Sequence, residues 1–185
     1  MNQAMNQAMN QTANRTVKIA PVRKTVIVEA TPERAFEVFT SGINRWWPKT
    51  HGIGATPIRE SIIEPFVGGR WYAKFEDGTE LVNGHVRTWE VGARFVVTWE
   101  ISAEWKSDPR VAFASEVDVQ FLPEAGGRTR VELEHRHFER MGDVAGETMR
   151  KGVDGGWPGL LELFAKEVSA GNDSLRSGTN QEVFT

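Results

Sequence analysis

The sequence predicts an α+β fold in which a curved antiparallel sheet wraps around a long C-terminal helix. Three observations support this prediction. One strand-like segment near the start precedes two short helical segments, six further strand-like segments follow in succession, and the last stretch has apolar residues at helical spacing. Because consecutive strands joined by short turns pair antiparallel, we expect about seven strands in one sheet.

The first strand is expected at residues 22–30, where apolar and polar side chains alternate along VRKTVIVEA. Thr31 and Pro32 follow, a pair typical of a helix N-cap and first turn, because proline needs no N–H donor there. A short amphipathic helix comes next. A second helical turn carries Trp46 and Trp47 and stops at a proline.

The six consecutive strands are each closed by residues that form turns. The clearest signal is Glu76-Asp77-Gly78, because Asp-Gly between two alternating segments is typical of a tight hairpin. The expected strands are residues 59–64, 70–75, 79–88, 94–101, 112–122 and 128–137.

One face of each strand is expected to point toward the helix. Side chains alternate across a strand, so every second residue lies on the same face. The predicted inward residues are Trp71, Ala73, Phe75, Phe95, Val97, Trp99, Val117, Val119 and Phe121.

The last helix has an apolar stripe that begins near Met149 and ends near Val168. Val153 and Trp157 lie on this stripe and would form the roof of any cavity over the sheet. Pro158 lies within it and lacks the N–H that an interior helical residue donates. The sequence therefore predicts a kink or a break at residues 154–158.

Composition narrows the class of protein. The chain has 185 residues, no cysteine and a net charge of −3, which fits one domain without disulfides or thiolate metal sites. It has no basic stripe for nucleic acid, no apolar run of about 20 residues for a membrane span, and no secretory signal segment. We therefore expect a soluble cytoplasmic protein that binds no nucleic acid.

The two ends differ in composition from the rest of the chain. Residues 1–17 open with the repeat MNQAMNQAMNQT, which is too polar to bury a core, and are predicted to form a disordered tail. Residues 171–185 are rich in Gly, Ser and Asn and are predicted to form a loose C-terminal tail. The folded domain is therefore expected at residues 18–170.

Five motifs in this order resemble a known family. They are TPERAFEVFT, INRWWP, EPFVGGRW, EDG followed by NGHVRTWEVGARFVVTW, and GGWPGLLELFAKEV. The sequence is similar to the START/Bet v 1-like (SRPBCC) superfamily, and within it to bacterial proteins related to the C-terminal domain of the activator of Hsp90 ATPase. The resemblance covers about Val22 to Val168 and implies the helix-grip fold.

The resemblance implies several functions rather than one. Members of this superfamily include carriers of hydrophobic ligands, polyketide cyclases and a co-chaperone, so the fold alone names no activity. The matching motifs are mostly structural and transfer no catalytic set. Where the eukaryotic co-chaperone has an additional N-terminal domain, this chain has a short Asn/Gln-rich segment, so a chaperone partner is not expected.

A ligand cavity is expected between the sheet and the C-terminal helix. Trp46 and Trp47 are neighbours in a helical turn and point about 100° apart, so we expect one of them to face the cavity. The predicted cavity residues are Trp46, Trp47, Trp71, Phe75, Val97, Trp99, Val119, Phe121, His135, His137, Met149, Val153 and Trp157.

Three titratable residues are the candidates for catalysis, if there is any. His135 and His137 lie two apart on the inner face of the last strand, where imidazoles can transfer protons or contact a ligand. Glu64 ends a strand. If its side chain faces the cavity, burial would raise its pKa; if it faces outward, it is a solvated charge, and the outward case is favoured. A metal site would need a third ligand; His51, His85 and Glu64 are candidates, but none has a diagnostic spacing, and we expect no metal or cofactor.

Three functions stay open, in this order. The first is binding of a small apolar or amphipathic molecule in the cavity, and it is favoured over catalysis. The second is a cyclase- or hydrolase-like enzyme that uses His137, His135 or Glu64 in the same cavity. The third is a chaperone-associated interaction domain. A homodimer is the commonest assembly, but the sequence names no interface.

Overall fold

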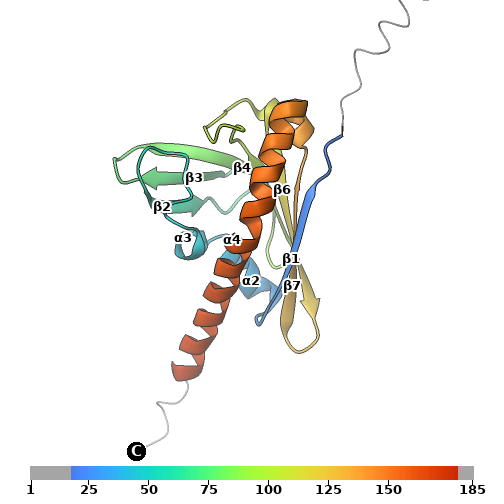
Figure 1. Ribbon diagram of the computed structural model, residues 1–185. Coiled ribbons are helices and arrows are strands. Elements are labelled where there is room, and N and C mark those ends of the chain that lie inside the picture. Colours follow the sequence, from blue (N-terminus) through green and yellow to red (C-terminus); the bar gives the residue numbers. More distant parts are fainter. Residues whose placement is uncertain (1–17, 179–185) are drawn as a thin grey trace, which may run out of the picture.

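The computed structural model describes residues 18–178 of the chain, with side chains to residue 171. The predicted tail at residues 1–17 lies outside the described residues, as do residues 179–185. One seven-stranded antiparallel sheet, in the order β1-β7-β6-β5-β4-β3-β2, curls around the long helix α4 (Figure 1). The predicted α+β helix-grip fold is confirmed.

The elements follow the predicted order along the chain. The strands are β1 (Val22–Val28), β2 (Ile58–Ile63), β3 (Arg70–Phe75), β4 (Glu80–Glu90), β5 (Arg94–Trp99), β6 (Ser115–Glu124) and β7 (Arg128–Arg136). The helices are α2 (Pro32–Phe39), α3 (Ile43–Trp46) and α4 (Asp143–Gly178), with short 3-10 turns at η1 (Val111–Phe113) and η2 (Phe138–Met141).

The two short helices lie where the sequence predicts them, although α3 ends at Trp46 and leaves Trp47 outside the helix. The Thr31 side chain accepts a hydrogen bond from the Arg34 backbone N–H at 3.3 Å and caps α2, which starts at Pro32. The Trp46 indole N–H donates to the Val38 carbonyl at 2.9 Å, which ties α3 to α2. This bond satisfies a buried indole and leaves the next residue, Trp47, free to face another direction.

The core lies between the inner face of the sheet, helix α2 and helix α4. Phe39 is its centre, because its ring contacts Phe95, Phe121 and Phe164 at centroid distances of 6.2, 5.9 and 5.2 Å. Two of these contacts are edge-to-face, a geometry that contributes about 0.5–1.5 kcal/mol per pair beyond the burial of area. All nine predicted inward residues of the strands are buried.

The outer face of the sheet is also partly covered, by its own ion pairs. Asp118 is 3% exposed, although it points away from the helix. Arg94 donates two hydrogen bonds to its carboxylate, at 3.0 and 2.6 Å, and Arg136 lies 2.8 Å away. Two arginines therefore compensate the burial of this charge.

Most strand boundaries differ from the prediction by one to three residues, and those of β6 and β7 have a clear physical reason. Strand β6 starts at Ser115 because the residues before it form η1, and it continues through Pro123 to Glu124. Proline is tolerated there because β5 begins opposite Gln120, so Pro123 lies beyond the end of β5. Strand β7 stops at Arg136, one residue before the predicted end.

Of the kink or break predicted in the last helix, the break is wrong. Helix α4 is continuous across residues 154–158 and runs to Gly178, into the segment predicted as a loose tail. Packing holds it together, because Val153 and Trp157 before the proline and Leu160 after it are all buried against the sheet. A single lost backbone hydrogen bond at Pro158 does not outweigh that buried area.

Candidate functional site

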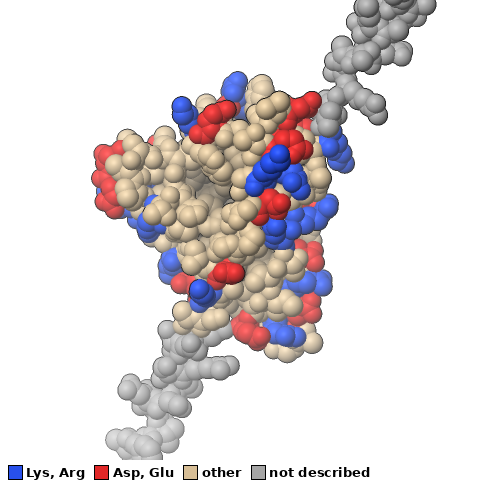
Figure 2. Space-filling view, viewed as in Figure 1, with Lys and Arg blue, Asp and Glu red and all other residues tan. Residues whose placement is uncertain are grey.

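A cavity of about 350 Å³ lies between the sheet and α4, where sequence analysis placed it. Strands β3, β4 and β5 form its floor, α4 forms one wall, and the loops after α3 and β5 form the mouth. Figure 2 shows a hollow on this face, bordered by residues that carry no charge. The lining residues are Trp47, Thr50, His51, Gly52, Ile53, Trp71, Asn83, Trp99, Ile101, Trp105, Gly152, Val153, Gly156, Trp157 and Leu160.

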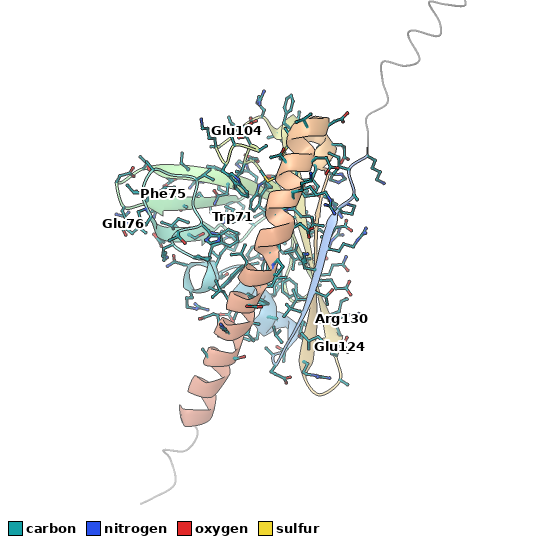
Figure 3. All side chains as sticks on the ribbon, viewed as in Figure 1. Trp71, Phe75, Glu76, Glu104, Glu124 and Arg130 are labelled. Atoms are coloured by element: carbon teal, nitrogen blue, oxygen red, sulfur yellow. The ribbon has the colours of Figure 1, made fainter. Side chains whose placement is uncertain are left out.

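Four indoles form a closed ring along the inner wall. Trp47 contacts Trp71 at a centroid distance of 5.2 Å, Trp71 contacts Trp99 at 5.5 Å, and Trp157 lies 6.2 Å from Trp99 and 6.3 Å from Trp47. Figure 3 shows Trp71 between β3 and α4, on the side of the strand that faces the helix. Most of the planes are steeply inclined, so the ring presents both indole faces and edges to the cavity.

Hydrogen bonds fix three of these indoles. The N–H of Trp47 donates to the His51 carbonyl at 3.0 Å, that of Trp71 to the Ser61 hydroxyl at 3.5 Å, and that of Trp157 to Nδ1 of His135 at 3.3 Å. A buried indole that is anchored in this way cannot rotate without losing its partner. The aromatic wall is therefore largely pre-formed.

His135 lies behind Trp157 and serves as its anchor. Its ring is fully buried, and burial lowers its pKa from 6.5 to about 3, so the imidazole is neutral at neutral pH. Because Nδ1 accepts the Trp157 N–H, the ring proton lies on Nε2, which donates to the Ser115 hydroxyl at 2.8 Å. A neutral ring with both nitrogens engaged positions Trp157 and has no free nitrogen for proton transfer.

Trp105 covers the mouth from the loop after β5. Its backbone is in the left-handed region, at φ 59°, which is unusual for a bulky residue. The indole packs over α4 at Gly152, where an added Cβ would lie 2.9 Å from Cζ2 of Trp105. Trp105 stays 48% exposed, as expected for a side chain with one face on the cavity and one in water.

Few polar side chains line the cavity, and His51 is the titratable residue among them. Thr50 and His51 lie at the mouth, with the Thr50 hydroxyl 3.3 Å from Nδ1 of His51. Asn83 lies deeper, on β4, and is 7% exposed. Within residues 18–171, whose side chains the structure describes, the lining contains no Asp, Glu, Lys or Arg.

Five of the predicted cavity residues line the cavity, and the rest lie elsewhere. Those that line it are Trp47, Trp71, Trp99, Val153 and Trp157. Those buried in the surrounding core are Trp46, Phe75, Val97, Val119, Phe121, His135 and Met149.

His137 lies outside the inner face on which sequence analysis placed it. The chain turns at this residue, which adopts φ 66°, and the turn buries Phe138 against His135 at a centroid distance of 4.6 Å. The His137 imidazole is instead 3.6 Å from the Glu139 carboxylate. The expected alternation ends at Arg136 because burying Phe138 requires the chain to turn.

Glu64 also lies away from the cavity. It accepts hydrogen bonds from the Arg70 backbone N–H at 2.8 Å and from the Arg70 guanidinium at 2.9 Å. These bonds lower its pKa, the opposite of the shift that a catalytic acid would need. Among the described residues, no three His, Asp or Glu side chains form a cluster for a metal ion.

Most of the residues that form the mouth were not predicted from the sequence. Thr50, His51, Ile53 and Trp105 lie in loops, where no periodicity indicates which side chains face inward. One signal was present: Asn83 interrupts the apolar alternation of β4 directly before a glycine, a combination that marks a bulge in a strand.

Comparison with known protein families shows which family the chain belongs to. Residues 29–169 match the family described as Activator of Hsp90 ATPase homolog 1-like protein. The chain belongs to this family. The match covers α2 through most of α4, and therefore every element that lines the cavity. The resemblance seen in the sequence motifs is confirmed. No curated protein matches the chain.

Two solved structures resemble the chain in sequence as well as in fold. The anthrahydroquino-γ-pyrone synthase Txn09, complexed with SUM, is 43% identical, with a TM-score of 0.58; the match covers 80% of this chain and 97% of Txn09. CalC, a self-sacrificing resistance protein from Micromonospora echinospora, is 29% identical, with a TM-score of 0.60; the match covers 81% of this chain and 94% of CalC.

A more distant structure supports the fold alone. Protein MLL2253 from Mesorhizobium loti is 20% identical, with a TM-score of 0.60, over 82% of this chain and 98% of that protein. Among the described residues, no helix is both long and apolar enough to span a membrane.

Proposed function

We propose that this protein binds a small, largely apolar aromatic molecule in the cavity between the sheet and α4. The ring of four indoles is the observation that supports this proposal most strongly. An open cavity of about 350 Å³ with a pre-formed aromatic wall is typical of a ligand site, and its size fits a molecule of a few fused rings.

The relationship to Txn09 supports an aromatic ligand. Txn09 is named as a synthase of an anthrahydroquino-γ-pyrone, a fused-ring oxygenated molecule, and is 43% identical to this chain. Flat aromatic ligands stack on indole faces or contact indole edges, and each good aromatic pair contributes about 0.5–1.5 kcal/mol. The ring of indoles offers both geometries.

A second candidate function is a cyclase-like reaction in the same cavity, favoured by the identity to a named synthase. His51 is the titratable side chain at the cavity lining. The three residues that sequence analysis proposed for catalysis are dispersed: His135 is behind the wall, while Glu64 and His137 lie elsewhere. Binding therefore stays the first proposal, since a reaction needs several polar groups around one point.

Glycine positions on α4 allow a direct test by filling the cavity. Gly156 lines the cavity, and a Cβ added there meets no atom within 4 Å, so Gly156→Leu should extend a side chain into the site. Gly155 is exposed on the same helix, and a Cβ there also meets nothing within 4 Å, so Gly155→Leu is the matched control.

The measurement is the quenching of tryptophan fluorescence during titration with neutral fused-ring aromatics such as anthraquinone. We expect saturable quenching with the wild type and with Gly155→Leu, and none with Gly156→Leu. Equal quenching of all three proteins would place the ligand outside the cavity and contradict the proposal. The homodimer and the cytoplasmic location expected from the sequence stay predictions.

A further inference from the structure

Asn83 is a buried amide whose hydrogen-bonding groups are not used by the described part of the protein. It is 7% exposed, and its side chain lines the cavity. The hydrogen bonds among the described residues include its backbone carbonyl, which accepts from the Glu100 N–H at 2.7 Å, but none to its side chain. Such an amide costs free energy unless something in the cavity pairs with it.

A break in the strand register presents this amide to the cavity. Trp71 pairs with Gly84 and Tyr72 pairs with Val82, so Asn83 is the extra residue of a bulge and has no partner across β3. A bulge re-aims one side chain and is frequent beside functional sites. Because Asn83 is on the cavity side of a mostly apolar wall, its amide can pair with a molecule in the cavity. The Trp99 indole N–H at the same lining is also buried and has no hydrogen-bond partner among the described residues.

Gly84 makes this bulge possible. A Cβ at this position would overlap the backbone carbonyl oxygen of Thr98 on β5, so only glycine allows the two strands to approach so closely. The adjacent His85 N–H then donates to the Thr98 hydroxyl at 2.7 Å. The backbone around Asn83 is therefore held on both sides, and its side chain has little freedom to turn away.

The charge of the wall limits what the amide can bind. The described residues place no Asp, Glu, Lys or Arg in the lining, so an ionised ligand would lose hydration there without meeting an opposite charge on one of these side chains. A neutral ligand avoids this cost. An amide also differs from a charged side chain in that it both donates and accepts, which suits a carbonyl or a hydroxyl on an aromatic ring.

We propose that Asn83 selects the ligand, by hydrogen-bonding a neutral carbonyl or hydroxyl of a planar aromatic molecule held against the four indoles. This inference rests on the proposed function and adds the chemical class: an oxygenated, uncharged aromatic such as a quinone or a phenol. Hydrocarbons of the same shape, and ionised analogues, should bind more weakly than the neutral oxygenated molecule.

Three probes of one ring system test this selection: anthraquinone, anthracene and anthraquinone-2-sulfonate. They share three fused rings and differ in the carbonyls and in the charge. Each is titrated into the wild type, Asn83→Leu and Asn83→Ala, and dissociation constants are taken from tryptophan quenching. Two variants are used so that a folding defect in one, detected by circular dichroism, leaves the other for the test.

For the wild type, we expect anthraquinone to bind more tightly than anthracene and the sulfonate to bind weakest. Asn83→Leu should weaken anthraquinone by about three- to tenfold, the net value of one hydrogen bond, without weakening anthracene. The inference is overturned if both variants keep the wild-type affinity for anthraquinone, or if the sulfonate binds as tightly as anthraquinone. If no probe binds the folded wild type, the proposed function fails as well. If anthraquinone binds but the Asn83 variants bind it equally well, only the role of Asn83 fails.

Discussion

Acidification should destabilise this protein through one buried side chain, His135. Its pKa is lowered from 6.5 in the unfolded chain to about 3 in the folded protein, because the ring is fully buried and contacts Trp99, Phe138 and Trp157. Below pH 6.5 the unfolded chain therefore takes up a proton that the folded protein does not. Stability is complete above about pH 6.5 and is lost progressively down to about pH 3.

The magnitude follows from the size of the shift. Each unit of pH within this window costs about 1.4 kcal/mol, so the fall from pH 6.5 to 5 removes about 2 kcal/mol. That loss is a large fraction of the roughly 5–15 kcal/mol by which single domains are stable. Glu64 and Asp154 have lowered pKa values and also lose stability in acid, but at lower pH, because their ordinary pKa values are 4.5 and 3.8.

Urea unfolding of the wild type and of His135→Gln, from about pH 7.5 down to about pH 5, isolates this contribution. Gln can donate and accept hydrogen bonds but does not titrate, so the carboxylates behave alike in both proteins. The stability advantage of the wild type at neutral pH should shrink by about 2 kcal/mol at pH 5. A constant difference across this range would mean that the ring is hydrated or already charged, and the anchoring role assigned to it would be refuted.

Three further substitutions have outcomes that the structure predicts. Gly84→Ala should destabilise the fold by about 3 kcal/mol or more, measured by urea unfolding, because the added methyl overlaps the Thr98 carbonyl; unchanged stability would contradict the close approach of the strands. Gly159→Ala should stabilise α4 by about 0.5–1 kcal/mol, since its Cβ meets nothing within 4 Å, and a lower melting temperature would count against this. Gly152→Ala should push Trp105 off the helix, raising acrylamide quenching of tryptophan emission with little change in stability; unaltered quenching would show that Trp105 does not rest there.

Periodicity in the sequence was sufficient to predict the framework. Alternation along β3, β5 and β6 identified the buried faces, and Thr31 with Pro32 marked the start of α2. These features depend on neighbours in sequence, which a single chain displays directly. The position of the cavity between sheet and helix followed from the order of the elements.

The details of the site depend on contacts between distant segments, and they were missed. The loop that carries Thr50 and His51 has no period, and the bulge at Asn83 depends on how closely β4 approaches β5. Pro158 was predicted to kink or break α4, but the helix is continuous, because local propensity was outweighed by the buried residues on both sides. Helix propensity is a weak prior where tertiary packing is extensive.

The ring of indoles has a photophysical consequence. The centroids of neighbouring indoles in this ring lie 5.2–6.3 Å apart, for Trp47, Trp71, Trp99 and Trp157. At this distance, excitation energy can pass from one indole to the next before emission. Light absorbed by one is then emitted by another with a different orientation, which depolarises the fluorescence. A ligand that quenches one indole should therefore dim all four, and replacing any one of them by Phe should raise the emission anisotropy of the rest.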